Sequence, residues 1–251
     1  MNLQDKKWLF LDVGNIILND DPGVAFAYKC YHDEVVKNGF DITFDDFLHE
    51  RDQIFAERGH LYNDLVAKYL SDSHIKKIRK RSYKEGQTRW GELNPLIPQS
   101  KQFIRKASEK YKLGIIANQP AVCEDVLRDH GLLEYFDFVG LSESVGLNKP
   151  DIDFFKFVIK EAGAHPNEAI MIGDRVDNDI APAKQLGMGT IHLKLNVYEK
   201  VNGLEISEEL KTYLPHVHQF NISFREPVSE AQNPHYAVNS FAELNKLLFN
   251  E

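Results

Sequence analysis

The chain is poor in cysteine, in long apolar runs and in positive charge, and each shortage excludes a class of protein. The 2 cysteines among 251 residues, Cys30 and Cys123, are too few and too far apart for a disulfide framework or a zinc-ligand spacing. No apolar stretch approaches the roughly 20 residues that a membrane-spanning helix requires. The apolar run at residues 8–11 is too short for a secretory signal. We therefore expect a cytoplasmic protein with reduced thiols and no membrane partner.

Acidic residues outnumber basic ones, and the formal net charge of −8 argues against a general nucleic-acid binder. Such proteins neutralise phosphates with lysine and arginine. The basic run at residues 74–81 could suggest nucleic acid, but Ile75 and Ile78 keep helical spacing within it. That spacing favours the solvated face of a helix. We expect no nucleic-acid partner.

Apolar runs of strand length alternate with helical patterns through most of the chain. This alternation is typical of a doubly wound parallel sheet with helices on both faces. It predicts an α/β fold with a Rossmann-like core, a last short strand at 237–238 and a capped helix over 240–248. The earlier strands are predicted at residues 7–13, 113–117, 138–141, 169–172 and 190–193.

Residues 22–90 interrupt the alternation with helical patterns alone. Their spacing predicts roughly four helices. We interpret this block as an α-helical cap domain, residues 21–90, inserted into a core made of residues 1–20 and 91–251. Residues 195–233 show weak periodicity, and only a short helix near 205–214 is predicted there.

Polar side chains follow the predicted strands at the points where the strands end. Ligands of doubly wound sheets bind beyond these carboxyl ends. A buried carboxylate is costly unless a cation or a donor compensates it, and Mg²⁺ takes oxygen ligands. The pattern predicts a magnesium site and metal-assisted transfer of a phosphoryl group. The side chains, in chain order, are Asp12, Asn118, Lys149, Asp174 and Asp179.

In order and context these residues resemble the haloacid dehalogenase superfamily of hydrolases, whose nucleophile is an aspartate. The most specific part of the resemblance is the segment from Gly173 to Ile180, and the likeness spans nearly the whole chain. It implies that Asp12 attacks phosphorus and forms an aspartyl-phosphate, which divides one difficult hydrolysis into two easier steps.

The same resemblance implies roles for the other residues. Mg²⁺ is expected to bridge Asp12, the carbonyl of Gly14, Asp174 and the phosphate. Lys149 is expected to lie beside the nucleophile and the phosphate, where it keeps Asp12 ionised and stabilises the transition state. Asp179 is expected at the metal site, where it holds a metal-bound water or orients Lys149.

Two positions depart from the pattern of the family. Most of its phosphatases carry a second Asp two residues after the nucleophile, which protonates the leaving group, and this chain has Gly14. Losing a general acid forfeits a factor of about 10²–10⁴, unless Asp20 or Asp21 replaces it. The second strand ends in Ala117 in place of Ser or Thr. Asn118, the next residue, is expected to bind the substrate by donating an amide hydrogen to a phosphate oxygen.

Three functions are compatible with this pattern. The first is a Mg²⁺-dependent phosphatase that acts on a small phosphorylated metabolite, such as a sugar phosphate, under a cap that closes over it. The second is a degenerate member that binds a phosphorylated ligand or partner with little turnover. The third is a metal-independent dehalogenase, in which so acidic a cluster would be out of place. The natural substrate and the oligomeric state stay open.

Other polar side chains carry no firm prediction. His216 and His218 alternate but have no third ligand nearby in the sequence, which argues against a zinc site. Six residues of the helical block are compatible with substrate contacts, although packing explains most of them equally well: Tyr28, Tyr31, His32, Arg51, His60 and Trp90.

Overall fold

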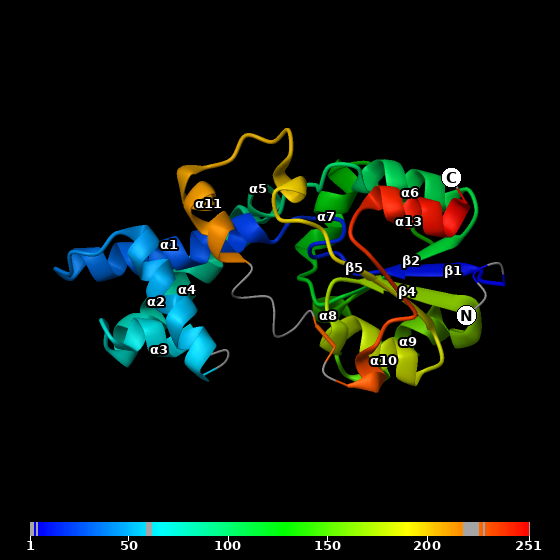
Figure 1. Ribbon diagram of the computed structural model, residues 1–251, viewed down its shortest axis with the longest axis horizontal. Coiled ribbons are helices and arrows are strands. Elements are labelled where there is room, and N and C mark those ends of the chain that lie inside the picture. The colour runs from blue at the N-terminus through cyan, green and yellow to red at the C-terminus, as the bar shows by residue number, and fades with distance from the viewer. Residues whose placement is uncertain (1–2, 4, 59–61, 218–225, 228, 251) are drawn as a thin grey trace. The chain divides into compact units, whose positions relative to one another are not determined.

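The computed structural model describes the chain except at residues 1–2, 4, 59–61, 218–225, 228 and 251. The chain divides into two compact units (Figure 1). The first, called the core unit here, comprises Met1–Asn19, Leu96–Asn202 and Phe224–Glu251. The second, the helical unit, comprises Asp20–Pro95 and Gly203–Ser223.

A parallel sheet forms the centre of the core unit. Its strands run in the order β3-β2-β1-β4-β5-β6, and every neighbouring pair is parallel. The predicted α/β fold is therefore confirmed, including the short last strand. The bounds are β1 (Trp8–Leu11), β2 (Lys112–Ala117), β3 (Phe138–Leu141), β4 (Ala169–Gly173), β5 (Gly189–Leu193) and β6 (Tyr236–Val238).

Helices cover both faces of this sheet, with α6 and α13 on one face and α9 and α10 on the other (Figure 1). Two begin with a side-chain cap: Asp151 accepts from the N–H of Asp153 in α9, and Ser240 accepts from the N–H of Glu243 in α13. The bounds are α6 (Ser100–Ser108), α7 (Val122–Asp129), α8 (Ser142–Val145), α9 (Ile152–Glu161), α10 (Ala181–Gln185) and α13 (Phe241–Phe249).

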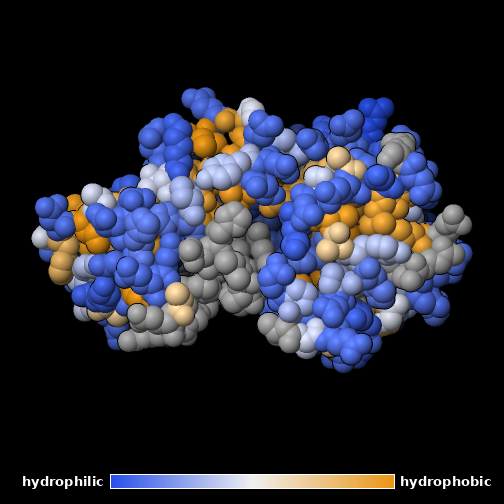
Figure 2. All heavy atoms as spheres, in the orientation of Figure 1, coloured by the Kyte–Doolittle hydropathy of each residue, from blue (hydrophilic) through white to orange (hydrophobic). Residues whose placement is uncertain are grey.

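Strand β1 lies in the middle of the sheet, which explains why its sequence is a continuous apolar run. Leu9, Phe10 and Leu11 are fully buried because neighbouring strands flank them and helices cover both faces. The Phe10 ring lies directly against Gly114 of β2, where a Cβ atom would come within 2.3 Å of the ring. In contrast to these buried strand residues, most side chains on the outer surface shown in Figure 2 are hydrophilic.

The helical unit contains helices throughout its described part. The bounds are α1 (Asp21–Lys37), α2 (Phe44–Arg58), α3 (Tyr62–Ala67), α4 (Asp72–Thr88), the single turn α5 (Trp90–Leu93) and α11 (Glu208–Tyr213). Ile75 and Ile78 are the buried residues of α4, which confirms that the basic run is one face of an amphipathic helix. Tyr28, Tyr31, His32, Arg51 and Trp90 are buried, and His60 lies outside the described residues.

One segment groups differently from the sequence-based assignment, which placed residues 203–223 in the core. Helix α11 packs against α1 and α2, and the ring of Tyr213 stacks on that of Tyr28 with centroids 6.1 Å apart. The chain therefore returns to the helical unit after β5. The weak periodicity of this segment gives no indication of that return.

Among the described residues, the helices are all too short or too polar to cross a membrane.

The contact between Phe10 and Gly114 makes a prediction about stability. In Gly114→Ala, the added methyl overlaps the Phe10 ring, and overpacking of this kind costs about 1–3 kcal/mol. We expect a lower melting temperature in circular dichroism. Gly86, inside α4, has open space around it, so Gly86→Ala should raise the melting temperature slightly through helix propensity. Equal shifts in both variants would contradict the tight packing seen at β1 and β2.

Candidate active site

Three buried carboxylates meet at the carboxyl ends of β1 and β4. The two strands are parallel neighbours with Leu11 opposite Ile172, and the N–H of Asp12 donates to the carbonyl of Ile172 at 2.9 Å. Asp12 and Asp174 therefore follow the ends of two neighbouring strands and lie side by side. Together with Asp179, their carboxylate oxygens all lie within 4.8 Å of one another.

A buried lysine lies among these carboxylates. Nζ of Lys149 is 2.8 Å from Oδ1 of Asp12 and 2.6 Å from Oδ1 of Asp179. Burial disfavours the ammonium form, but the two carboxylates outweigh it and raise the pKa of Lys149 above its usual value. The lysine is therefore charged and fixed in position.

Asn118, at the end of β2, holds the backbone of Lys149. Its Nδ2 donates to the Lys149 carbonyl at 2.9 Å, and its Oδ1 accepts from the Lys149 N–H at 2.7 Å. This pair of bonds makes Asn118 a positioning residue for Lys149. The expected contact between Asn118 and a phosphate oxygen stays a prediction.

Asp179 lies in a π-helical turn, Val176–Ile180, that directly precedes α10. Its Oδ2 accepts from the N–H of Arg175 at 3.0 Å, so both carboxylate oxygens have donors. Burial raises the pKa of Asp179 to about 7, against the opposing effect of Lys149. A Cβ atom on Gly173 would come within 2.4 Å of the Asp179 side chain, which explains the glycine at the end of β4.

The loop after Asp12 is held by its own backbone and by a distant lysine. Oδ1 of Asp12 accepts from the N–H of Val13 at 2.8 Å. Asn15 has a φ of 56°, a left-handed conformation that asparagine tolerates better than most residues. Nζ of Lys200, a buried side chain, donates to Oδ1 of Asn15 at 2.6 Å. Lys200 thus fixes the loop that contains Gly14.

His192 of β5 supports the other side of the site. Its Nε2 donates to the backbone carbonyl of Asp174 at 2.9 Å. Burial lowers the pKa of His192 below its usual value, so the ring is neutral. Neither His192 nor Lys200 is predicted from the sequence, because each lies in a segment without a polar motif and reaches the site only through the fold.

The cluster carries more negative charge than its lysine neutralises. Among the described residues, Arg175 also lies close to the cluster, and its guanidinium pairs with Asp177 at 2.6 Å. Burial raises the pKa of Asp12, and the nearby charge of Asp174 adds to the increase. Buried oxygen ligands with excess negative charge fit a hard divalent cation. The residues present therefore suit such a metal.

The ion pairs of Lys149 generate a second prediction. Removing one partner of a buried pair leaves uncompensated charge and typically costs about 3–5 kcal/mol. We expect Lys149→Met to lose that much free energy of unfolding in urea, measured with chelator present. Lys156 pairs with Asp153 at 2.8 Å on the surface, so Lys156→Met should change little. Similar losses in the two variants would refute the buried network.

Known proteins resemble the chain over most of its length. The sequence profile of the haloacid dehalogenase-like hydrolases matches residues 33–193. A glyceraldehyde 3-phosphate phosphatase of Methanocaldococcus jannaschii is 28% identical over 207 residues, 80% of this chain and 91% of its own length. Another, from Pyrococcus furiosus, is 26% identical over 217 residues, 84% of this chain and 88% of its own length.

A solved structure shows the same fold. The HAD phosphatase of Thermococcus onnurineus aligns with a TM-score of 0.58 and 24% identity, over 98% of this chain and 99% of its own. The profile covers more than half of the chain, including β2 to β5 and the segment from Gly173 to Ile180. This chain is a member of the haloacid dehalogenase-like hydrolase family.

Proposed function

We propose that the chain is a Mg²⁺-dependent phosphatase that hydrolyses a small phosphorylated metabolite through an aspartyl-phosphate on Asp12. One observation carries the proposal: Asp12 lies 2.8 Å from the buried ammonium of Lys149, inside a cluster of three carboxylates. The two relatives described above are named glyceraldehyde 3-phosphate phosphatases, which supports a sugar phosphate of triose size as the substrate.

The contacts of Asp12 indicate which oxygen attacks. Both the Val13 N–H and Nζ of Lys149 donate to Oδ1, which orients the carboxylate and points to Oδ2 as the nucleophile. A bond forms between Oδ2 and phosphorus, and the bond from phosphorus to the ester oxygen breaks. Water then attacks phosphorus, releases inorganic phosphate and restores the Asp12 carboxylate.

Lys149 has two functions in this proposal. Its charge favours the ionised form of Asp12, and it can stabilise negative charge on the phosphoryl oxygens in the transition state. Asn118 holds the Lys149 backbone, and Asp179 holds its ammonium. We assign Asp179 to this positioning role, with any contact to the metal through a water.

The metal would be held by the side chains of Asp12 and Asp174 and by the carbonyl of Gly14. When bound, Mg²⁺ would supply positive charge between the carboxylate and the phosphate, which otherwise repel each other. His192 and Lys200 serve this ligand set indirectly, since they hold the backbone of Asp174 and the loop at Asn15.

The helical unit is proposed as the cap. It is inserted in the chain directly after the loop that follows Asp12 and interrupts the core between Asn19 and Leu96. The residues proposed to bind phosphate, Asn118 and Lys149, are both in the core unit. We therefore assign selection among phosphorylated substrates to the helical unit. We assign the described residues 203–217 to that proposed cap in addition to residues 21–90.

Gly14 and Ala117 favour one alternative, a degenerate member that binds a phosphorylated ligand with little turnover. The retained pairing of Asp12 with Lys149 opposes it, because a pure binder gains nothing from an oriented nucleophile. A metal-independent dehalogenase is less compatible with three clustered carboxylates.

The central prediction concerns Asp12. We expect Asp12→Asn to reduce hydrolysis of an aryl phosphate by roughly a thousandfold or more, because no covalent intermediate forms. Asp153→Asn, which changes an exposed carboxylate, serves as the matched control and should keep full activity. Unchanged melting temperatures show that folding is intact.

Two further outcomes decide between the alternatives. In the wild type, chelator should abolish turnover and Mg²⁺ should restore it, whereas a dehalogenase of the metal-independent kind would release halide from a haloacid with chelator present. Undiminished phosphatase activity in Asp12→Asn refutes the nucleophile.

Gly14 predicts a strong dependence on the leaving group. Without a general acid next to the nucleophile, phosphate esters of basic alcohols should react about 10²–10⁴ times more slowly than they would with such an acid. Aryl phosphates, whose aryloxide group leaves as a stable anion, should be hydrolysed much faster than alkyl phosphates at equal concentration. Equal kcat/KM values across a series of leaving groups would show that another residue donates the proton, because kcat/KM includes the step in which the leaving group departs.

A further inference from the structure

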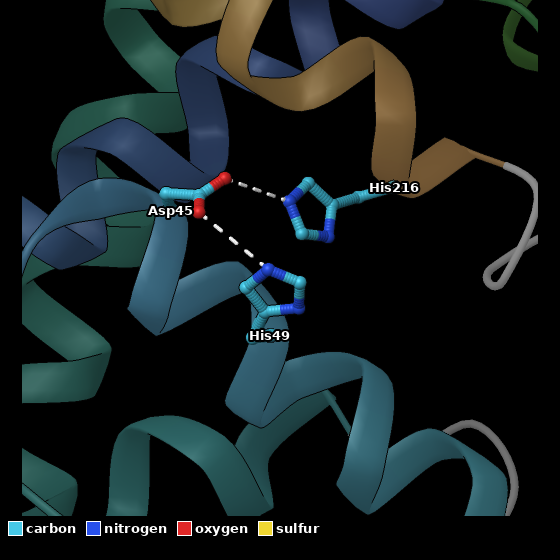
Figure 3. A group of neighbouring side chains, drawn as sticks. All are labelled: Asp45, His49 and His216. Atoms are coloured by element: carbon cyan, nitrogen blue, oxygen red, sulfur yellow. Dashed lines mark hydrogen bonds and ion pairs between the residues drawn. The ribbon is translucent and has the colours of Figure 1, made fainter.

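A second cluster of metal-binding side chains lies in the helical unit, independent of the proposed active site. Asp45 and His49 are four residues apart on α2, so they share one face of the helix. His216 comes from the turn after α11, and both imidazole rings point toward the Asp45 carboxylate (Figure 3). His216 and His218 have no third ligand nearby in the sequence, so a zinc site is not predicted from the sequence. The fold supplies two, Asp45 and His49, from more than 160 positions away.

The distances in this cluster match those between ligands of one ion. Nε2 of His216 is 3.2 Å from one oxygen of Asp45, and Nε2 of His49 is 3.5 Å from the other. Two ligands that each lie 2.0–2.1 Å from a tetrahedral zinc ion are roughly 3.3 Å apart. The ligand atoms of all three residues lie within 4.8 Å of one another.

A carboxylate behind the ring orients His216. Nδ1 of His216 lies 2.6 Å from Oδ2 of Asp52. With the proton on Nδ1, this contact leaves the lone pair of Nε2 directed at the cluster. Metal-binding histidines almost always have such a partner on the second nitrogen. His216 itself is buried, with 4% of its side chain exposed.

Arg51 in turn holds the carboxylate of Asp52 in position. It donates to Oδ1 of Asp52 through Nε at 2.9 Å and Nη2 at 2.6 Å, and also to the His216 carbonyl at 2.9 Å. Its guanidinium lies close to the rings of both Tyr28 and Tyr213, 4.9 and 5.4 Å from their centroids. Buried side chains therefore fix the position of His216 without any contribution from the exposed ligands.

We propose that Asp45, His49 and His216 bind a divalent transition metal, with zinc as the best match. Two imidazoles and a carboxylate are typical zinc ligands, and three protein ligands leave the fourth position to water. Asp45 and His49 are mostly exposed, at 57% and 63% of their side chains, so the ion has access from solvent. Bound metal would connect α2 to the turn at residues 214–216 and stabilise the segment that returns to the helical unit.

The competing explanation is a metal-free network in which His216 contacts the carboxylates of Asp45 and Asp52. That network explains the contacts of His216 but does not require His49. The ring of His49 lies 4.7 Å from that of His216 in an edge-on arrangement, and its Nε2 is 3.5 Å from the same Asp45 carboxylate. His49 therefore separates the two explanations.

The test uses the untagged full-length protein, stripped with chelator and then dialysed against zinc chloride with excess Mg²⁺. Metal analysis should find one zinc ion per chain, and zinc should raise the melting temperature. Cobalt in place of zinc should give the visible absorption of tetrahedral Co²⁺. His49→Ala should abolish binding and the thermal shift, and Asp52→Asn should weaken binding roughly 10- to 100-fold.

Two matched variants control for adventitious binding. His165 is exposed in the core unit, and His165→Ala should bind zinc like the wild type. Asp174→Asn removes a carboxylate of the proposed active site and should also keep the zinc. Binding that survives His49→Ala, that is lost in Asp174→Asn, or that is missing in the wild type overturns the proposal. The proposed phosphatase activity is tested separately with Asp12→Asn, because the two sites share no residue.

Discussion

The ion pairs of Lys149 are the interaction on which the acidic site depends. Three carboxylates gathered in a buried place repel one another, and burial raises the energy of each charged form. One ammonium group within 2.8 Å of two of them offsets part of that cost. The remaining charge makes the same site suitable for a divalent cation. The arrangement therefore couples folding of the core unit to the chemistry we propose.

The parallel sheet provides the frame for this interaction. Because β1 is paired with both β2 and β4, the residues that follow these three strands converge at one edge of the sheet. Asn118 then holds Lys149, His192 holds the backbone of Asp174, and Lys200 holds Asn15. These supporting contacts leave each charged group little freedom, which is what electrostatic stabilisation of a transition state requires.

The histidine cluster of the helical unit shows the same principle in another setting. A buried arginine and a carboxylate fix His216 from behind, and exposed groups on α2 complete the cluster. The acidic cluster of the core unit suits a hard cation such as Mg²⁺, whereas imidazole ligands suit zinc. The chain would then bind two different metals at sites with different ligands. Mg²⁺ in the core unit would serve the proposed reaction, and zinc in the helical unit would stabilise the segment that contains α11 and His216.

The sequence by itself determined the fold class, since apolar runs and helical spacing are local signals that each strand and helix carries within a few residues. It also indicated the polar residues at the strand ends, because the carboxyl ends of parallel strands meet at one edge. Tertiary structure alone decided which distant side chains meet. Lys200 and Asn15 are 185 residues apart, and His216 and Asp45 are 171 apart. Periodicity shows which residues of one helix or strand face the same side. It does not show which residues from distant parts of the chain pack against that side after folding.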